Sequence, residues 1–152
     1  MPLALIRPSE WEFPLFLHVL GAMALVGALM FVATALILAW SRGDEGGVAL
    51  RRWAFRGMFF GVLPSYVLMR VGAQWVESRE NLSEADKDSA WIGIGYITAD
   101  IGALLILISL ILSGIGLRKL QGHALGRIIG VVSVLLLVAY LVAVWAMTTK
   151  PS

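Results

Sequence analysis

The 152-residue chain contains no cysteine, which excludes disulfides, thiolate metal sites and cysteine nucleophiles. Charged residues are also scarce, at 14% of the chain against about a quarter in soluble proteins. No activated serine, paired carboxylates or phosphate-binding loop is present, so nothing in the sequence supports hydrolysis or names another reaction. No basic surface with interleaved aromatic residues indicates a nucleic-acid partner.

Apolar residues, in contrast, make up 59% of the chain, which is more than a small soluble core could bury. Four runs are long enough to cross a bilayer, which needs about 20 residues in a helix. In hydrocarbon the backbone must satisfy its own hydrogen bonds, so each run is expected to be α-helical. The sequence therefore predicts a single all-α domain over 1–152, an integral membrane four-helix bundle with spans at 14–40, 57–76, 91–117 and 128–147.

The distribution of charge between the spans predicts their orientation. Loops 41–56 and 118–127 are basic, whereas residues 77–90 contain five acidic side chains against two basic ones. The positive-inside rule places the two basic loops in the cytoplasm and both termini outside, in a bacterial-type inner membrane. Tryptophans support the span boundaries because indoles prefer the headgroup region. All six lie at or near predicted span ends: Trp11, Trp40, Trp53, Trp75, Trp91 and Trp145.

Small residues and one proline suggest how the helices pack. Gly126 and Gly130 form a GxxxG pattern, which is compatible with a dimer contact but is expected to be ordinary packing within the bundle. Pro64 is expected to kink the second span because its missing N–H leaves the carbonyl of Phe60 without its usual partner.

Three ionisable residues inside the spans carry the functional argument. His18, Arg70 and Asp100 lie on three different spans, yet all three fall in the outer half of the membrane. Such residues are costly in lipid and are usually paired or functional. We therefore expect them to meet in a polar pocket open to the outside. Helical spacing adds neighbours on the same faces, namely Tyr66, Gln74 and Tyr96, with Tyr140 of the fourth span placed to close the pocket.

Less functional interpretations of the same residues stay open. Arg70 and Asp100 would form an ion pair that only offsets the cost of burying each charge. His18 would then be a hydrogen-bonded packing residue, and His123 a solvated residue of the second basic loop. Methionines near His18, namely Met23, Met69 and Met147, are compatible with copper, but methionine also commonly fills apolar gaps.

The segment Leu17-His18-Val19-Leu20-Gly21-Ala22, followed by Gly27, resembles the first helix of copper-resistance D type four-helix membrane proteins. It also resembles a related bacterial family of predicted integral membrane proteins without known function. A weaker resemblance links it to HemJ-type protoporphyrinogen oxidases, which carry a haem-linked histidine on the first helix. These resemblances imply a haem or a metal ion at His18.

Three hypotheses for the function follow. The first is a ligand pocket that holds haem b through His18, with Arg70 and Tyr66 meeting a propionate. The second is a non-catalytic accessory or assembly subunit, bound to a membrane-protein partner or to further copies of itself. The third is transport of a small ion, copper or a proton. In all three the surrounding partner is the lipid bilayer.

Overall fold

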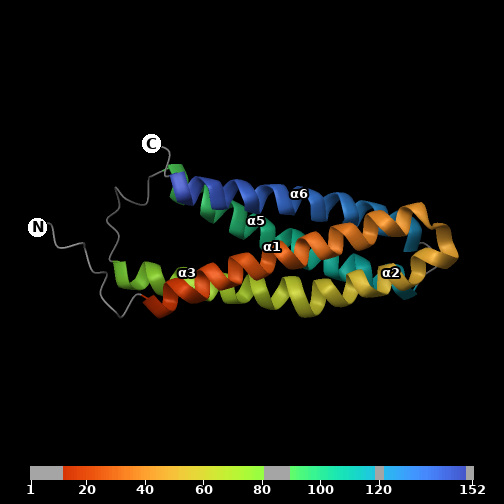
Figure 1. Cartoon of the computed structure of the whole chain (residues 1–152), viewed down its shortest axis with the longest axis horizontal. Coiled ribbons are helices and arrows are strands. Elements are labelled where there is room, and N and C mark those ends of the chain that lie inside the picture. The colour runs from red at the N-terminus through yellow and green to blue at the C-terminus, as the bar shows by residue number, and fades with distance from the viewer. Residues whose placement is uncertain (1–11, 81–89, 119–121, 150–152) are drawn as a thin grey trace, which may run out of the picture.

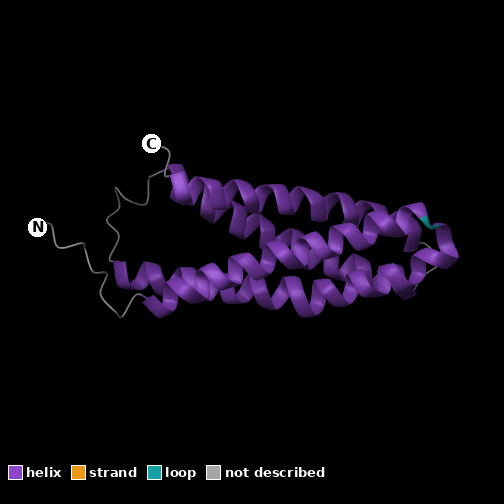
Figure 2. Cartoon of the chain, in the orientation of Figure 1, coloured by secondary structure: helices purple, strands orange, loops and turns teal. Residues whose placement is uncertain are grey.

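The computed structural model describes residues 12–80, 90–118 and 122–149 (Figure 1). Every described residue except Arg42 is helical, which confirms the all-α prediction (Figure 2). The elements in chain order are α1 (Glu12–Ser41), α2 (Gly43–Gly57), the π-helical segment η2 (Met58–Val62), α3 (Leu63–Glu80), α5 (Ala90–Arg118) and α6 (Gly122–Thr149). Trp11 and most of the predicted acidic loop lie outside the described residues.

Three of the described helices are long and apolar enough to cross a membrane. They are α1, α5 and α6. The second predicted span corresponds to η2 and α3, which continue from α2 without interruption between Gly43 and Glu80. Because this region also contains Arg70 and Glu77, its crossing remains a proposal.

The prediction of a loop at 41–56 is wrong, because residues from Gly43 onward form helix α2. Only Arg42 separates α1 from α2, and Gly43 follows with a φ of 67°, which glycine adopts without strain. Gly47 then faces the backbone of Ala39, where an added Cβ would lie 2.9 Å from the carbonyl oxygen. The glycines therefore serve a tight turn and a close helix contact. The second basic loop is also shorter than predicted, because α6 begins at Gly122 and already includes His123.

The disturbance predicted at Pro64 takes the form of a π-helical turn. Pro64 has no N–H to donate to the carbonyl of Phe60. The preceding residue, Leu63, donates its backbone N–H to the carbonyl of Met58, five residues earlier. One extra residue is thereby accommodated in the turn before the proline.

Helix α1 is the centre of the bundle. It packs extensively against α3, α2 and α6, and α5 packs mainly against α6. The core between them is apolar and includes Leu25, Leu29, Val32, Met58 and Ile106. Many large apolar side chains remain exposed on the outer faces of all the long helices, as expected of surfaces that contact lipid.

Glycines allow the backbones of α1 and α3 to touch. A Cβ added to Gly21 would lie 2.3 Å from the backbone nitrogen of Met69, and one added to Gly72 would lie 2.5 Å from that of His18. Gly130 of the GxxxG pattern faces the ring of Trp40, and Gly126 faces the side chain of Arg51. The GxxxG pattern therefore makes contacts within the chain.

The bundle opens at one end. Figure 1 shows that the start of α1 and the end of α3 lie together, as do the start of α5 and the end of α6, with the two pairs separated. Helices α3 and α5 pack only sparsely against each other, so the side of the bundle between them is weakly closed.

The close contact between α1 and α3 predicts a strong effect of a side chain at Gly72. We expect Gly72→Leu to destabilise the protein by at least about 2 kcal/mol, because the new side chain would overlap the backbone of α1. Gly27→Leu is the matched control, since nothing lies within 4 Å of a Cβ there. Thermal unfolding in detergent, followed by far-ultraviolet circular dichroism, measures both. Equal losses for the two variants would contradict the contact.

Candidate functional site

An ion pair joins α3 to α5. Nη2 of Arg70 lies 2.9 Å from Oδ1 of Asp100, which confirms the predicted pairing of these residues. The Arg70 side chain is 24% exposed and that of Asp100 is 64% exposed. The pair therefore lies at the surface of the bundle, where α3 and α5 are weakly packed, and its carboxylate is open to a further donor.

Two hydrogen bonds between the same helices flank this ion pair. The Tyr66 hydroxyl donates to the backbone carbonyl of Ala99 at 3.1 Å. The Tyr96 hydroxyl donates to the Glu77 carboxylate. The Arg70 guanidinium also lies 5.3 Å from the centre of the Tyr96 ring, within the range of a cation–π interaction.

These links define the α3–α5 polar cluster, which consists of Tyr66, Arg70, Glu77, Tyr96 and Asp100. Four of its five members were predicted as site residues, and Glu77 was assigned to the acidic outer loop instead. Its spacing could have revealed it, because Glu77 follows Arg70 by seven residues and so lies on the same helix face. The acidic character of the following residues concealed this signal.

His18 was predicted to meet Arg70 and Asp100, but it makes a different contact. Its Nδ1 is 2.9 Å from the carbonyl oxygen of Met69, to which it donates. The ring therefore crosses from α1 to the backbone of α3, whereas Arg70 reaches from the next residue of α3 toward α5. In the neutral ring, donation from Nδ1 leaves Nε2 as the nitrogen that could bind a metal.

The two remaining predicted residues, Gln74 and Tyr140, lie outside the polar cluster. Gln74 is exposed on α3. Tyr140 is only 4% exposed and packs against Gly102, two residues beyond Asp100 on α5. Its hydroxyl is buried without a hydrogen-bond partner among the described residues. Tyr140 therefore belongs to the core beneath the polar cluster.

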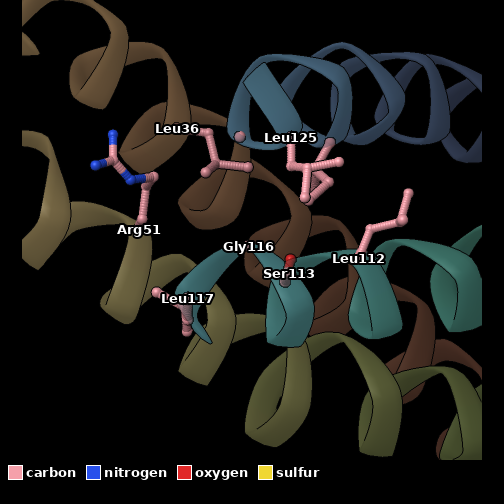
Figure 3. A pocket seen from close by; sticks show the side chains of 9 residues that line it. Leu36, Arg51, Leu112, Ser113, Gly116, Leu117 and Leu125 are labelled. Carbon is pink, nitrogen blue, oxygen red and sulfur yellow. The ribbon is translucent and has the colours of Figure 1, made fainter. Parts of the chain in front are cut away.

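Neither of the two described cavities is lined by the predicted site residues. The first, of about 20 Å³, lies between α1, α2, α5 and α6 at the opposite end of the bundle, where Ser113 and Gly116 face Leu36 (Figure 3). The second is an apolar groove between α1 and α2. Within the α3–α5 polar cluster only Asp100 is exposed, and the other four side chains are half-buried.

The described residues contain no group of three or more His, Asp or Glu side chains placed to hold a metal ion. The methionines considered for copper have separate surroundings: Met23 is exposed, Met69 belongs to the core and Met147 faces Gly95. Comparison of the whole chain with family models, curated proteins and solved structures finds no match.

The geometry predicts energetic coupling between Arg70 and Asp100. We expect Arg70→Ala and Asp100→Ala each to destabilise the protein, and the double variant to lose about 1 kcal/mol less than the sum, because either single change leaves a charge without its partner. The control is the double variant Tyr66→Phe with Asp100→Ala. Tyr66 donates to the carbonyl of Ala99 and not to Asp100, so these two losses should simply add. Reversible unfolding by sodium dodecyl sulfate in mixed micelles measures these free energies, and strictly additive losses for the ion pair would contradict the coupling.

Proposed function

We propose that the chain is an accessory subunit without catalytic activity, which uses the α3–α5 polar cluster to bind a membrane-protein partner. In this proposal it crosses the membrane four times, with α2, η2 and α3 containing the second crossing. Both termini lie outside, in a bacterial-type inner membrane, because the basic residues gather at the opposite end. The start of α1 and the end of α6 share one end of the bundle, as this arrangement requires (Figure 1).

The exposed carboxylate of Asp100 is the observation that carries the proposal. A charged side chain within a membrane helix costs about 3 kcal/mol on insertion scales, and the cost falls when the charge is paired and hydrogen-bonded. The hydrogen bond from Arg70 goes to Oδ1 of Asp100, and most of the Asp100 side chain remains exposed. A donor from a neighbouring protein helix would satisfy the other oxygen and cover the pair.

The surroundings of Asp100 suit a helical partner. Ile97, Ile101 and Leu104 are exposed around it and form an apolar stripe on one face of α5. Interhelical hydrogen bonds between polar side chains within such apolar contacts stabilise the association of membrane helices by about 0.6 kcal/mol each, and up to about 2 kcal/mol. A partner helix with a serine, asparagine or arginine at the depth of Asp100 would meet both requirements.

Cross-linking at this face tests the proposal, and the lack of native cysteines makes single-cysteine variants selective. We expect Ile97→Cys in native membranes to cross-link to a partner with a short bifunctional maleimide. Asp100→Asn in that background should reduce the yield at least about threefold, because a hydrogen bond to a charged group is lost.

Leu141→Cys is the matched control. Leu141 is exposed on α6 and follows Tyr140, which faces Gly102, so it lies close to the depth of Asp100 on another side of the bundle. A cross-linked species of twice the monomer mass would identify the partner as a second copy. Equal yields from both positions, or a yield indifferent to Asp100→Asn, would overturn the proposal.

Haem b binding is the second candidate, and the hydrogen bond of His18 favours it. Histidines that bind metals usually donate their other nitrogen to a carbonyl or carboxylate, as Nδ1 of His18 does to Met69. The donor therefore suits haem iron. The space does not, because the backbones of α1 and α3 touch at Gly21 and Gly72 on either side of this contact. We rank haem binding second for this reason, and no observation favours ion transport over either candidate.

Absorption spectroscopy separates the two candidates. If the accessory function is correct, protein purified from haem-replete cells should show no Soret band, and His18→Ala should alter only its stability, by about 1 kcal/mol for the lost hydrogen bond. A Soret band that disappears in His18→Ala would instead establish haem binding. Gln74→Ala, an exposed position on α3, controls for the effects of substitution near the same end of the bundle.

A further inference from the structure

An apolar groove with a volume of about 440 Å³ runs between α1 and α2, at the end of the bundle opposite the polar cluster. Helix α1 contributes four of the lining residues and α2 contributes two. They are Phe31, Thr34, Ala35, Leu38, Leu50 and Trp53. Only Thr34 is polar among them, so the groove suits a hydrocarbon chain.

Arginines stand beside this groove. The Arg56 guanidinium lies 5.2 Å from the centre of the Trp53 ring, and Trp53 itself is 56% exposed where it lines the groove. Arg52 is exposed on the same face of α2, one turn earlier. Glu45 is an exposed acid of α2, but it lies about two turns before Arg52, so Arg52 and Arg56 leave an excess of positive charge next to Trp53.

At this level of the bundle, α2 carries charged residues where the neighbouring part of α1 is still apolar. Gly57 of α2 faces Phe31 and Val32 of α1, so the adjacent Arg56 lies at the depth where α1 is still apolar. From Val32 to Trp40, α1 contains no charged residue and continues for about 12 Å beyond this level. Charged and apolar surfaces therefore lie side by side at one depth, and neither water nor lipid tails alone suit both.

We propose that the α1–α2 groove binds an anionic phospholipid. One acyl chain lies in the groove against Ala35 and Phe31, toward the middle of the bilayer, and the phosphate pairs with the guanidinium groups of Arg56 and Arg52. A planar guanidinium that stacks on tryptophan retains its edge donors for phosphate oxygens. Anionic headgroups also gain favourable energy from basic residues near the membrane surface, which supplies the selectivity over neutral lipids.

This proposal is independent of the accessory function. The groove involves α1 and α2, whereas the α3–α5 polar cluster lies toward the other end of the bundle (Figure 1). Lipid binding can be measured on the purified chain alone, without a membrane-protein partner. A negative result for one proposal therefore does not bear on the other.

Native mass spectrometry of the detergent-purified protein tests the site with two lipids of identical chains, dioleoylphosphatidylglycerol and dioleoylphosphatidylcholine. We expect one phosphatidylglycerol molecule to bind at least about fivefold more tightly than phosphatidylcholine, and Arg56→Gln to remove about fivefold of that affinity. Arg127→Gln, an exposed arginine of α6 at the same end of the bundle, should leave the affinity unchanged.

A second variant tests the groove without altering charge. Leu38→Trp fills the groove and keeps both arginines, so it should weaken both lipids by a similar factor; Leu50→Trp replaces it if the first variant loses helicity by circular dichroism. Equal binding of the two lipids, equal loss in Arg56→Gln and Arg127→Gln, or full binding with the groove filled would each overturn the proposal.

Discussion

The direct backbone contact between α1 and α3 is the constraint on which the other features depend. Gly21 and Gly72 bring the two helices together at a distance that no Cβ would permit. This contact fixes the rotation of α3, and with it the direction of every side chain on that helix. Met69 is turned into the core, where its carbonyl accepts from His18, and Arg70 is turned toward α5.

Polar links at the open end compensate for sparse packing. Helices α3 and α5 have few close backbone contacts, so long side chains bridge them: Arg70 reaches Asp100, and Tyr66 and Tyr96 donate across the same gap. In a bilayer the hydrophobic effect does not drive helices together, and hydrogen bonds and ion pairs contribute a larger share of their association. The polar cluster thus has a structural role in closing the bundle, and its exposed carboxylate remains available to a partner.

Much of this arrangement could be predicted from the sequence, because hydropathy and helical spacing determine which residues share a face. The helices near 14–40, 91–117 and 128–147 and the pairing of Arg70 with Asp100 were accessible in this way. Helix α2 was not, since three glycines and several charges at 41–56 are typical of a loop unless the packing of Gly47 on Ala39 is known. The contact of His18 with a backbone carbonyl was also inaccessible, because a carbonyl carries no signature in the sequence.

The π-helical turn before Pro64 determines which way the cluster points. A π turn takes up one residue more than an α-helical turn, and one residue corresponds to a rotation of about 100° about the helix axis. Without that residue, everything after Leu63 would be turned by this angle relative to α2. Tyr66, Arg70 and Glu77 would then leave α5, while the packing of Ala54 and Met58 upstream stayed as it is. The extra residue of the π-helical turn therefore determines how the side chains of α3 are rotated about the helix axis relative to those of α2.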